Sequence, residues 1–186
     1  RSLILMWFIF PIVKALHEMG HAVMTKAFGG ESHEMGVMLL LLMPLPYVDA
    51  SSASRFRLRR ERVLVGAAGM MVEVLLGTFA LIIWVYIEPG LIRSIAYNVF
   101  FTAGVSTIVF NLNPLLRYDG YYILADLIEI PNLRSKSMSF LLYVVERFLF
   151  KVPGRTSPAI TTSERNWLAF YGPAPLAYRL LVIAMI

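Results

Sequence analysis

The chain has 186 residues, of which 58% are hydrophobic and 16% are charged, whereas soluble domains carry about 25% charged residues. This composition predicts an integral membrane protein, and the modest net charge of +5 comes without the aromatic-basic pattern of a nucleic-acid-binding surface. Because cysteine is absent, the chain has no disulfide, no cysteine-ligated metal site and no cysteine nucleophile.

The first predicted element is a membrane-spanning helix over Leu3–Phe28, which contains the motif HEMGH at residues 17–21. The apolar run Met35–Val48 follows it. This run is too short to cross a bilayer and is interrupted by Pro44 and Pro46. We therefore expect a short membrane-associated strand or a re-entrant segment there.

A second and a third span are predicted over Val63–Ile87 and Leu91–Leu112. The loop before the second span holds five arginines at residues 55–62, and the positive-inside rule places that loop in the cytoplasm. The third span runs into NLNPLLRYDG, where Pro114 and Gly120 are expected to break the helix.

The C-terminal part is predicted to form an interfacial amphipathic helix over Phe140–Phe150, a polar linker over Val152–Glu164 and the start of a fourth span over Trp167–Ile186. The last run has no polar flank, so we expect a fragment of a longer protein. The predicted fold class is an all-α, multi-pass membrane protein with about four transmembrane helices and a short strand or re-entrant segment.

The motif HEMGH points to metal chemistry. In a helix, positions i and i+4 lie on one face, so His17 and His21 can bind one metal ion, and Glu18 lies beside it to take a proton from water. Zinc suits imidazole ligands where no redox step is needed. Ionisable residues within a membrane span are costly and are therefore treated as functional.

A catalytic zinc usually has three protein ligands and one open position. The best third candidate is Asp119, because a broken helix lets its carboxylate turn toward a neighbouring helix and line a cavity. A turn is the alternative for Asp119-Gly120. His33 more simply belongs to a polar turn. Four glutamates are also formally available as a third ligand: Glu31, Glu34, Glu73 and Glu129.

Together, HEMGH and NLNPLLRYDG resemble the site-2 protease family of intramembrane zinc metallopeptidases, whose pattern is HExxH plus NxxPxxxxDG. The resemblance implies that His17, His21 and Asp119 are zinc ligands, that Glu18 is the general base and that Asn111 lies near the scissile carbonyl. It also implies a catalytic membrane core over residues 1–130, followed by a C-terminal part over residues 131–186.

Two further stretches bear on this resemblance. GVMLLLLMPLPYVDAS is similar to a bacterial branch of peptide zinc metalloproteases that is associated with peptide secretion. GAAGMMVE departs from the family's small-residue motif, because Glu73 stands near the usual asparagine. Glu73 is then either a partner of His17 or His21 or the polar end of a helix contact. Asn111 is either an oxyanion donor or an interhelical hydrogen-bonding residue.

The expected function is that of an intramembrane zinc endopeptidase that cuts peptide bonds in or near transmembrane segments. An edge strand within Met35–Val48 is expected to hold the unwound substrate by strand addition, or else to anchor the chain at the interface. The alternative function is a non-catalytic, metal-binding component of a peptide export or maturation system. Expected partners are a membrane-associated peptide or protein substrate, the lipid bilayer and a secretion system, with no nucleic acid, in the bacterial inner membrane.

Overall fold

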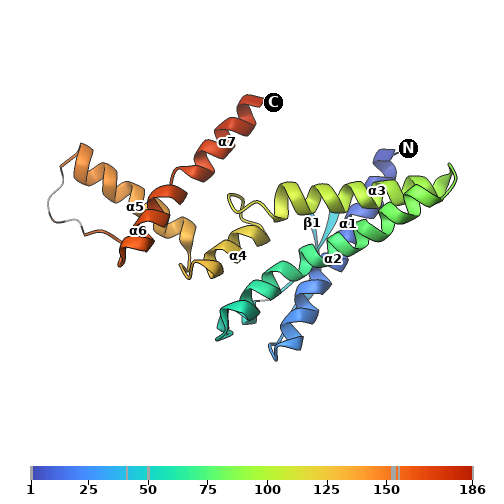
Figure 1. Ribbon diagram of the computed structural model, residues 1–186, viewed down its shortest axis with the longest axis horizontal. Helices are drawn as coiled ribbons and strands as arrows, with labels where there is room; N and C mark the ends of the chain where they lie inside the picture. The colour runs from blue at the N-terminus through green and yellow to red at the C-terminus, as the bar shows by residue number, and fades with distance from the viewer. Residues whose placement is uncertain (1, 41, 50, 152–153, 155, 186) are drawn as a thin grey trace. The chain divides into compact units, whose positions relative to one another are not determined.

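The computed structural model describes residues 2–40, 42–49, 51–151, 154 and 156–185. The chain forms two compact units, Arg1–Ile123 and Leu124–Ile186 (Figure 1). The predicted boundary between residues 130 and 131 stays a prediction. The elements, in chain order, are α1 (Ser2–Ala27), β1 (Met35–Leu40), β2 (Met43–Val48), the 3₁₀-helix η1 (Ser51–Arg55), α2 (Arg59–Tyr86), α3 (Leu91–Val105), the π-helix η2 (Ser106–Asn111), α4 (Asp119–Leu127), α5 (Leu133–Val144), the π-helix η3 (Val145–Leu149), α6 (Thr162–Tyr171) and α7 (Ala174–Met185).

Among the described residues, three helical runs are long and apolar enough to cross a membrane: Arg59–Tyr86, Leu91–Asn111 and Thr162–Met185. These runs coincide with the second, third and fourth predicted spans, and their length and composition indicate a membrane protein. That each run crosses the bilayer stays a prediction. The first predicted span is helical as α1, which has 26 residues and contains Pro11. Whether α1 crosses the membrane stays a prediction.

In the first unit, α2 and α3 form an antiparallel helix pair, and α1 packs against both. Ile9 and Val13 of α1 meet Ala103 of α3 in a small buried core. A Cβ placed on Gly77 of α2 would lie 3.6 Å from the Cβ of Ala103, so small residues let these two helices approach closely. Polar side chains on the same helix faces are therefore enclosed between the helices.

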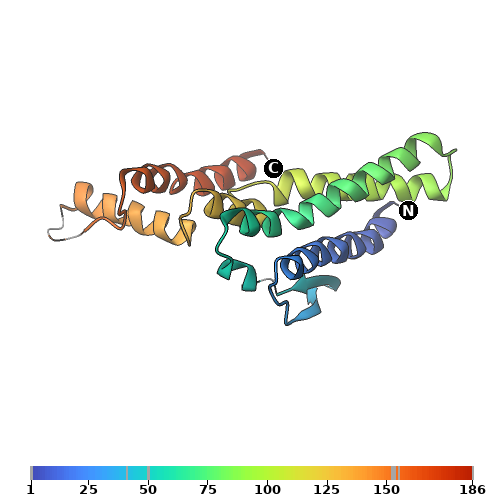
Figure 2. The ribbon, with the colours of Figure 1, turned by 60° about the horizontal axis from the view of Figure 1, so that its bottom comes forward.

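The predicted strand in the apolar run is confirmed, as an antiparallel hairpin of β1 and β2. β2 packs against α1, and Figure 2 shows the hairpin alongside that helix. The pair next to the turn is Leu40 and Met43, which is a hydrogen-bonded pair. From there, non-hydrogen-bonded and hydrogen-bonded pairs alternate along an antiparallel ladder. Pro44 and Pro46 therefore fall at positions whose missing N–H would have pointed away from β1.

The α3 helix continues as η2, where the N–H of Leu112 donates to the carbonyl of Thr107 at 2.8 Å, across five residues. Such π-turns often occur at functional sites. The helix then breaks over residues 112–118, as predicted for Pro114. Gly120 was expected to belong to the break, but it lies inside α4.

Gly120 has a packing role instead. A Cβ on this residue would lie 2.7 Å from the carbonyl oxygens of Asn111 and Leu112. Only glycine lets the start of α4 approach the end of η2 so closely. The close approach brings the adjacent Asp119 next to the three-helix assembly.

In the second unit, α5 packs against α6, and Lys136 Nζ lies 3.1 Å from Glu164 Oε1. The predicted interfacial helix corresponds to the second half of α5 and to η3, and its interfacial position stays a prediction. The predicted linker, residues 152–164, ends earlier than expected. The hydroxyl of Thr161 accepts from the N–H of Glu164 at 3.1 Å and caps α6, so the helix begins at Thr162. Positions 152, 153 and 155 lie outside the described residues.

Candidate metal centre

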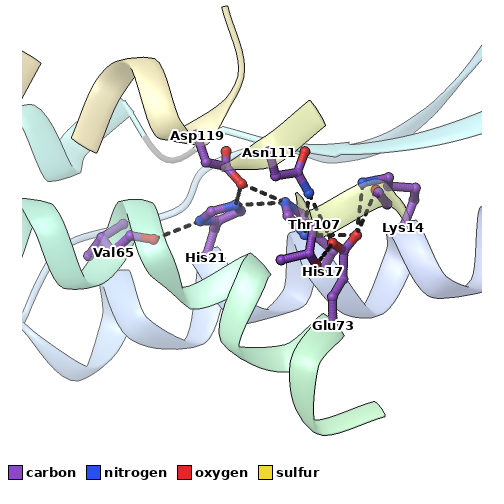
Figure 3. A network of polar contacts seen from close by, with 9 residues as sticks. Lys14, His17, His21, Val65, Glu73, Thr107, Asn111 and Asp119 are labelled. Atoms are coloured by element: carbon purple, nitrogen blue, oxygen red, sulfur yellow. Dashed lines mark hydrogen bonds and ion pairs between the residues drawn. The ribbon is translucent and has the colours of Figure 1, made fainter. Parts of the chain in front are cut away.

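The two histidines of HEMGH lie on one buried face of α1. Their Nε2 atoms are 3.1 Å apart, and both side chains are almost completely buried (Figure 3). The helical spacing of four residues produces this arrangement locally. Both rings therefore present one nitrogen to a common point.

Asp119, the first residue of α4, reaches the same point from a different element. Its Oδ2 lies 3.0 Å from His17 Nε2 and 3.5 Å from His21 Nε2. Three ligand atoms bound to one tetrahedral zinc ion at about 2.0–2.2 Å lie roughly 3.3–3.6 Å from each other. The observed triangle therefore has nearly the size that a single bound ion requires, and His17, His21 and Asp119 form a metal-ligand group by composition and distance.

The outer nitrogens of both rings indicate which atoms carry hydrogen. His21 Nδ1 lies 2.7 Å from the carbonyl oxygen of Val65, and His17 Nδ1 lies 3.2 Å from Glu73 Oε1. Each of these oxygens can only accept, so each Nδ1 carries a hydrogen and donates it. In the neutral rings, each Nε2 then offers a lone pair to the centre.

Two imidazole lone pairs and a carboxylate oxygen therefore converge on one point. Their negative ends repel each other, so positive charge between them is needed to stabilise the arrangement. Protons on the rings or a metal ion can supply that charge. Where protons supply it, burial raises the pKa of the Asp119 carboxyl, but the hydrogen bonds that both Nε2–H groups then donate outweigh burial and hold that pKa below its usual range. Where a metal ion supplies it, the donor set of two imidazole nitrogens and one carboxylate oxygen fits zinc with one position left open.

Glu18 lies on the same turn of α1 as the two histidines and is half-buried. Its carboxylate is close enough to interact electrostatically with both imidazoles and with Asp119. Within the described part of the chain, no hydrogen bond engages this carboxylate, and it is not one of the three converging ligands. It is therefore available to exchange a proton beside the metal position.

Asn111 lies beside the centre at the end of η2. Its Nδ2 donates to Glu73 Oε2 at 3.0 Å and comes within 3.5 Å of His17 Nδ1. Asn111 Nδ2 and His17 Nδ1 both carry hydrogen, so neither accepts from the other and the Glu73 carboxylate accepts from both. The interhelical hydrogen bond considered from the sequence is thus present, and one N–H of the amide remains for another acceptor.

Other residues divide into those near the centre and those far from it. Glu73 contacts His17 and not His21, which selects between the two partners considered for it. His33 pairs with Glu31 at 3.3 Å on the surface, away from the centre. Lys14 was not predicted as a site residue from the sequence, although it lies three residues before His17 and so on the same helix face.

Gly69 gives the His17 ring its space, and Gly69→Ala is expected to displace that ring. An added Cβ would lie 2.5 Å from His17 Cε1 and 2.6 Å from its Cδ2, which is a steric clash. We expect zinc affinity, measured by competition with a chelator, to fall by at least about tenfold. Gly77→Ala on the same helix is the control, because its Cβ would make an ordinary contact at 3.6 Å. Equal zinc affinity in both variants would contradict this role.

The chain is similar to one curated protein, "Putative peptide zinc metalloprotease protein YydH" of Bacillus subtilis (strain 168), at 30% identity over 147 residues. The similarity covers 77% of this chain and 55% of that protein, so the chain spans about half the length of the relative. No family model matches the chain, and no solved structure matches it with significance.

Proposed function

We propose that this chain carries the catalytic centre of a membrane-embedded zinc metalloendopeptidase of the site-2 protease type. The observation that carries the proposal is the convergence of His17, His21 and Asp119 from two separate elements, with Glu18 beside them. The name of the relative supports the peptidase class, and the three candidate spans support a membrane setting.

The residues have distinct roles in this proposal. His17 and His21 would hold the ion through Nε2, and Asp119 would hold it through Oδ2. Zinc, when bound, supplies Lewis-acid activation of a water molecule and of the peptide carbonyl. Glu18 accepts a proton from the attacking water and returns it to the leaving amine. The second N–H of the Asn111 amide is directed to the developing oxyanion.

We further propose that the substrate is a membrane-spanning or membrane-associated peptide or protein in the bacterial cytoplasmic membrane, and that a secretion system is a partner. A peptide bond within a helix is inaccessible to attack, because the backbone is enclosed by its own hydrogen bonds and side chains. The substrate must therefore unwind near the centre, and an unwound segment needs new backbone partners.

The β1 strand can provide those partners. β2 packs against α1, and its outer edge has lost two N–H groups to Pro44 and Pro46, so β1 has the open edge of this hairpin. β1 is exposed along most of its length, with Leu39 76% accessible. Addition of an extended substrate strand to β1 would satisfy the free backbone groups of both chains.

Leu39→Pro tests this strand addition. Leu39 faces Pro44 across the ladder, at a position whose N–H points outward, so proline removes a group of the open edge and no bond to β2. We expect the kcat/KM for a transmembrane peptide to fall by about tenfold, with zinc content and thermal stability retained. Leu39→Ala keeps the N–H and is the control. If both variants cleave equally well, the edge does not bind substrate.

The proposed function is tested by incubating the purified protein, in detergent or in liposomes, with a transmembrane peptide and identifying the fragments by mass spectrometry. We expect cleavage that stops when zinc is removed by a chelator and returns when zinc is added. Glu18→Gln should bind zinc without cleaving. A wild-type protein that binds zinc and the peptide but never cleaves it would favour the non-catalytic, metal-binding alternative.

A further inference from the structure

Glu73 is a fully buried carboxylate in the middle of α2, a helix that is long enough to cross a membrane and has no other charged residue after its first turn. A buried charge is costly unless several groups compensate it. Its presence in such a position therefore requires groups around it that compensate the charge.

Five donors surround this single carboxylate. Lys14 Nζ, His17 Nδ1 and Ser106 Oγ lie 2.8, 3.2 and 3.2 Å from Oε1, while Thr107 Oγ1 and Asn111 Nδ2 lie 2.6 and 3.0 Å from Oε2. Figure 3 shows Lys14, His17, Thr107 and Asn111 around the carboxylate. A carboxylate has about four lone-pair positions, so this one is saturated and acts only as an acceptor. It must therefore be ionised.

These donors come from two helices, α1 and the π-helix η2, while Glu73 itself lies on α2. Lys14 and His17 belong to α1, while Thr107 and Asn111 belong to η2, where the π-turn places both on the side that faces α2. The salt bridge with Lys14 balances the charge of Glu73. The hydroxyl and amide donors fix the orientation of the carboxylate, so Oε1 is directed at the His17 ring.

The ring itself is held from two sides by α2. Gly69 leaves the space that the ring occupies, and Glu73, one helical turn further along, receives its Nδ1 hydrogen. A ring whose Nδ1 hydrogen is bound this way has its Nε2 lone pair directed at the centre, and the anionic acceptor increases the basicity of that nitrogen.

We propose that Glu73 is a positioning residue that holds His17 in the metal-binding tautomer and orientation and, through the same carboxylate, holds Asn111 beside it. This inference rests on the proposed function only so far as the centre binds a metal, and it does not need a peptide substrate. The opposing explanation is that Lys14 and Glu73 form a buried ion pair that serves helix packing alone.

Three variants separate the two explanations: Lys14→Met, Glu73→Met and the double variant Lys14→Met/Glu73→Met. Replacing both charges with apolar side chains of similar length leaves no uncompensated charge, and such replacements are often neutral for stability. The double variant should therefore fold. Glu61→Gln, in the first turn of the same helix, is the control for loss of a carboxylate.

Zinc affinity is measured by chelator competition on the purified protein, with thermal unfolding and the visible spectrum of the cobalt-substituted protein as further readouts. We expect Glu73→Met and the double variant to bind zinc about 10–100-fold more weakly and to shift the cobalt bands. Lys14→Met keeps the carboxylate and should lower thermal stability while leaving zinc affinity little changed. Glu61→Gln should match the wild type.

The opposing explanation makes a different prediction for the double variant. If the pair serves packing alone, the double variant will bind zinc as tightly as the wild type, and that result overturns the proposal. A wild-type protein that binds no zinc also overturns it, together with the proposed function. Tight zinc binding without peptide cleavage, by contrast, contradicts only the proposed function and leaves the role of Glu73 in place.

Discussion

Glu18→Gln is expected to keep zinc at the wild-type content and to reduce the rate of peptide cleavage by at least about 100-fold. Glutamine has nearly the same shape as glutamate, but its amide cannot take a proton from water near neutral pH. The three converging ligand atoms belong to other residues, so the substitution leaves the metal-binding group intact. Zinc content is measured by elemental analysis and cleavage by mass spectrometry on the same preparation.

Glu34→Gln is a suitable control, because Glu34 is exposed beyond the end of α1. This variant should cleave the peptide at the wild-type rate. Loss of zinc in Glu18→Gln would show that Glu18 supports metal binding and would weaken its assignment as a base. Retention of both zinc and full cleavage would mean that another group moves the proton, and the electrostatic contact of Glu18 with both histidines would then need another explanation.

The long helices of this fold could be predicted well from the sequence because long apolar runs are recognised by local composition. Continuous apolar runs predicted α2, the α3–η2 run and the last helices within a few residues. The hairpin was predicted less fully. A short apolar run with two prolines indicated a strand, but the pairing of β1 with β2 depends on residues across a turn.

The candidate metal centre was likewise predictable only where it depends on local helix geometry. His17 and His21 are four positions apart on one helix, so local geometry alone brought them together. Asp119 was found from the break in the helix before it, but its distance from the histidines depends on how Gly120 packs against η2. That packing is a tertiary property, and the sequence had suggested a helix break at Gly120 instead.

The partner of Glu73 could not be predicted from the sequence. The sequence indicated a costly carboxylate in an apolar span, which called for a partner but did not identify one. The partner follows from the register in which α1 packs on α2, since Val65 reaches His21 and Glu73 reaches both His17 and Lys14. A shift of one helical turn would have paired these residues differently.

Asp119→Ala is expected to lose zinc and peptide cleavage together. The energy of a four-ligand structural zinc site, about 10–16 kcal/mol, corresponds to roughly 3–4 kcal/mol per ligand. Loss of one ligand should thus weaken zinc affinity by about 100–1,000-fold. The effect should be near the upper end, because Asp119 is the one anion in the ligand group and two neutral imidazoles would remain. Affinity is measured by chelator competition and activity with the transmembrane peptide.

Asp126→Ala tests whether any loss comes only from disturbing α4, since Asp126 lies on the same helix but outside the ligand group. We expect it to keep zinc and activity. If Asp119→Ala retains both as well, the third ligand is a different residue. Glu73 is the other carboxylate that contacts His17, but it faces Nδ1, on the side of the ring away from the centre, and could bind the ion only if that ring turned over. Loss of zinc binding and peptide cleavage in Asp119→Ala, with both retained in Asp126→Ala, would therefore identify the first residue of α4 as the third ligand.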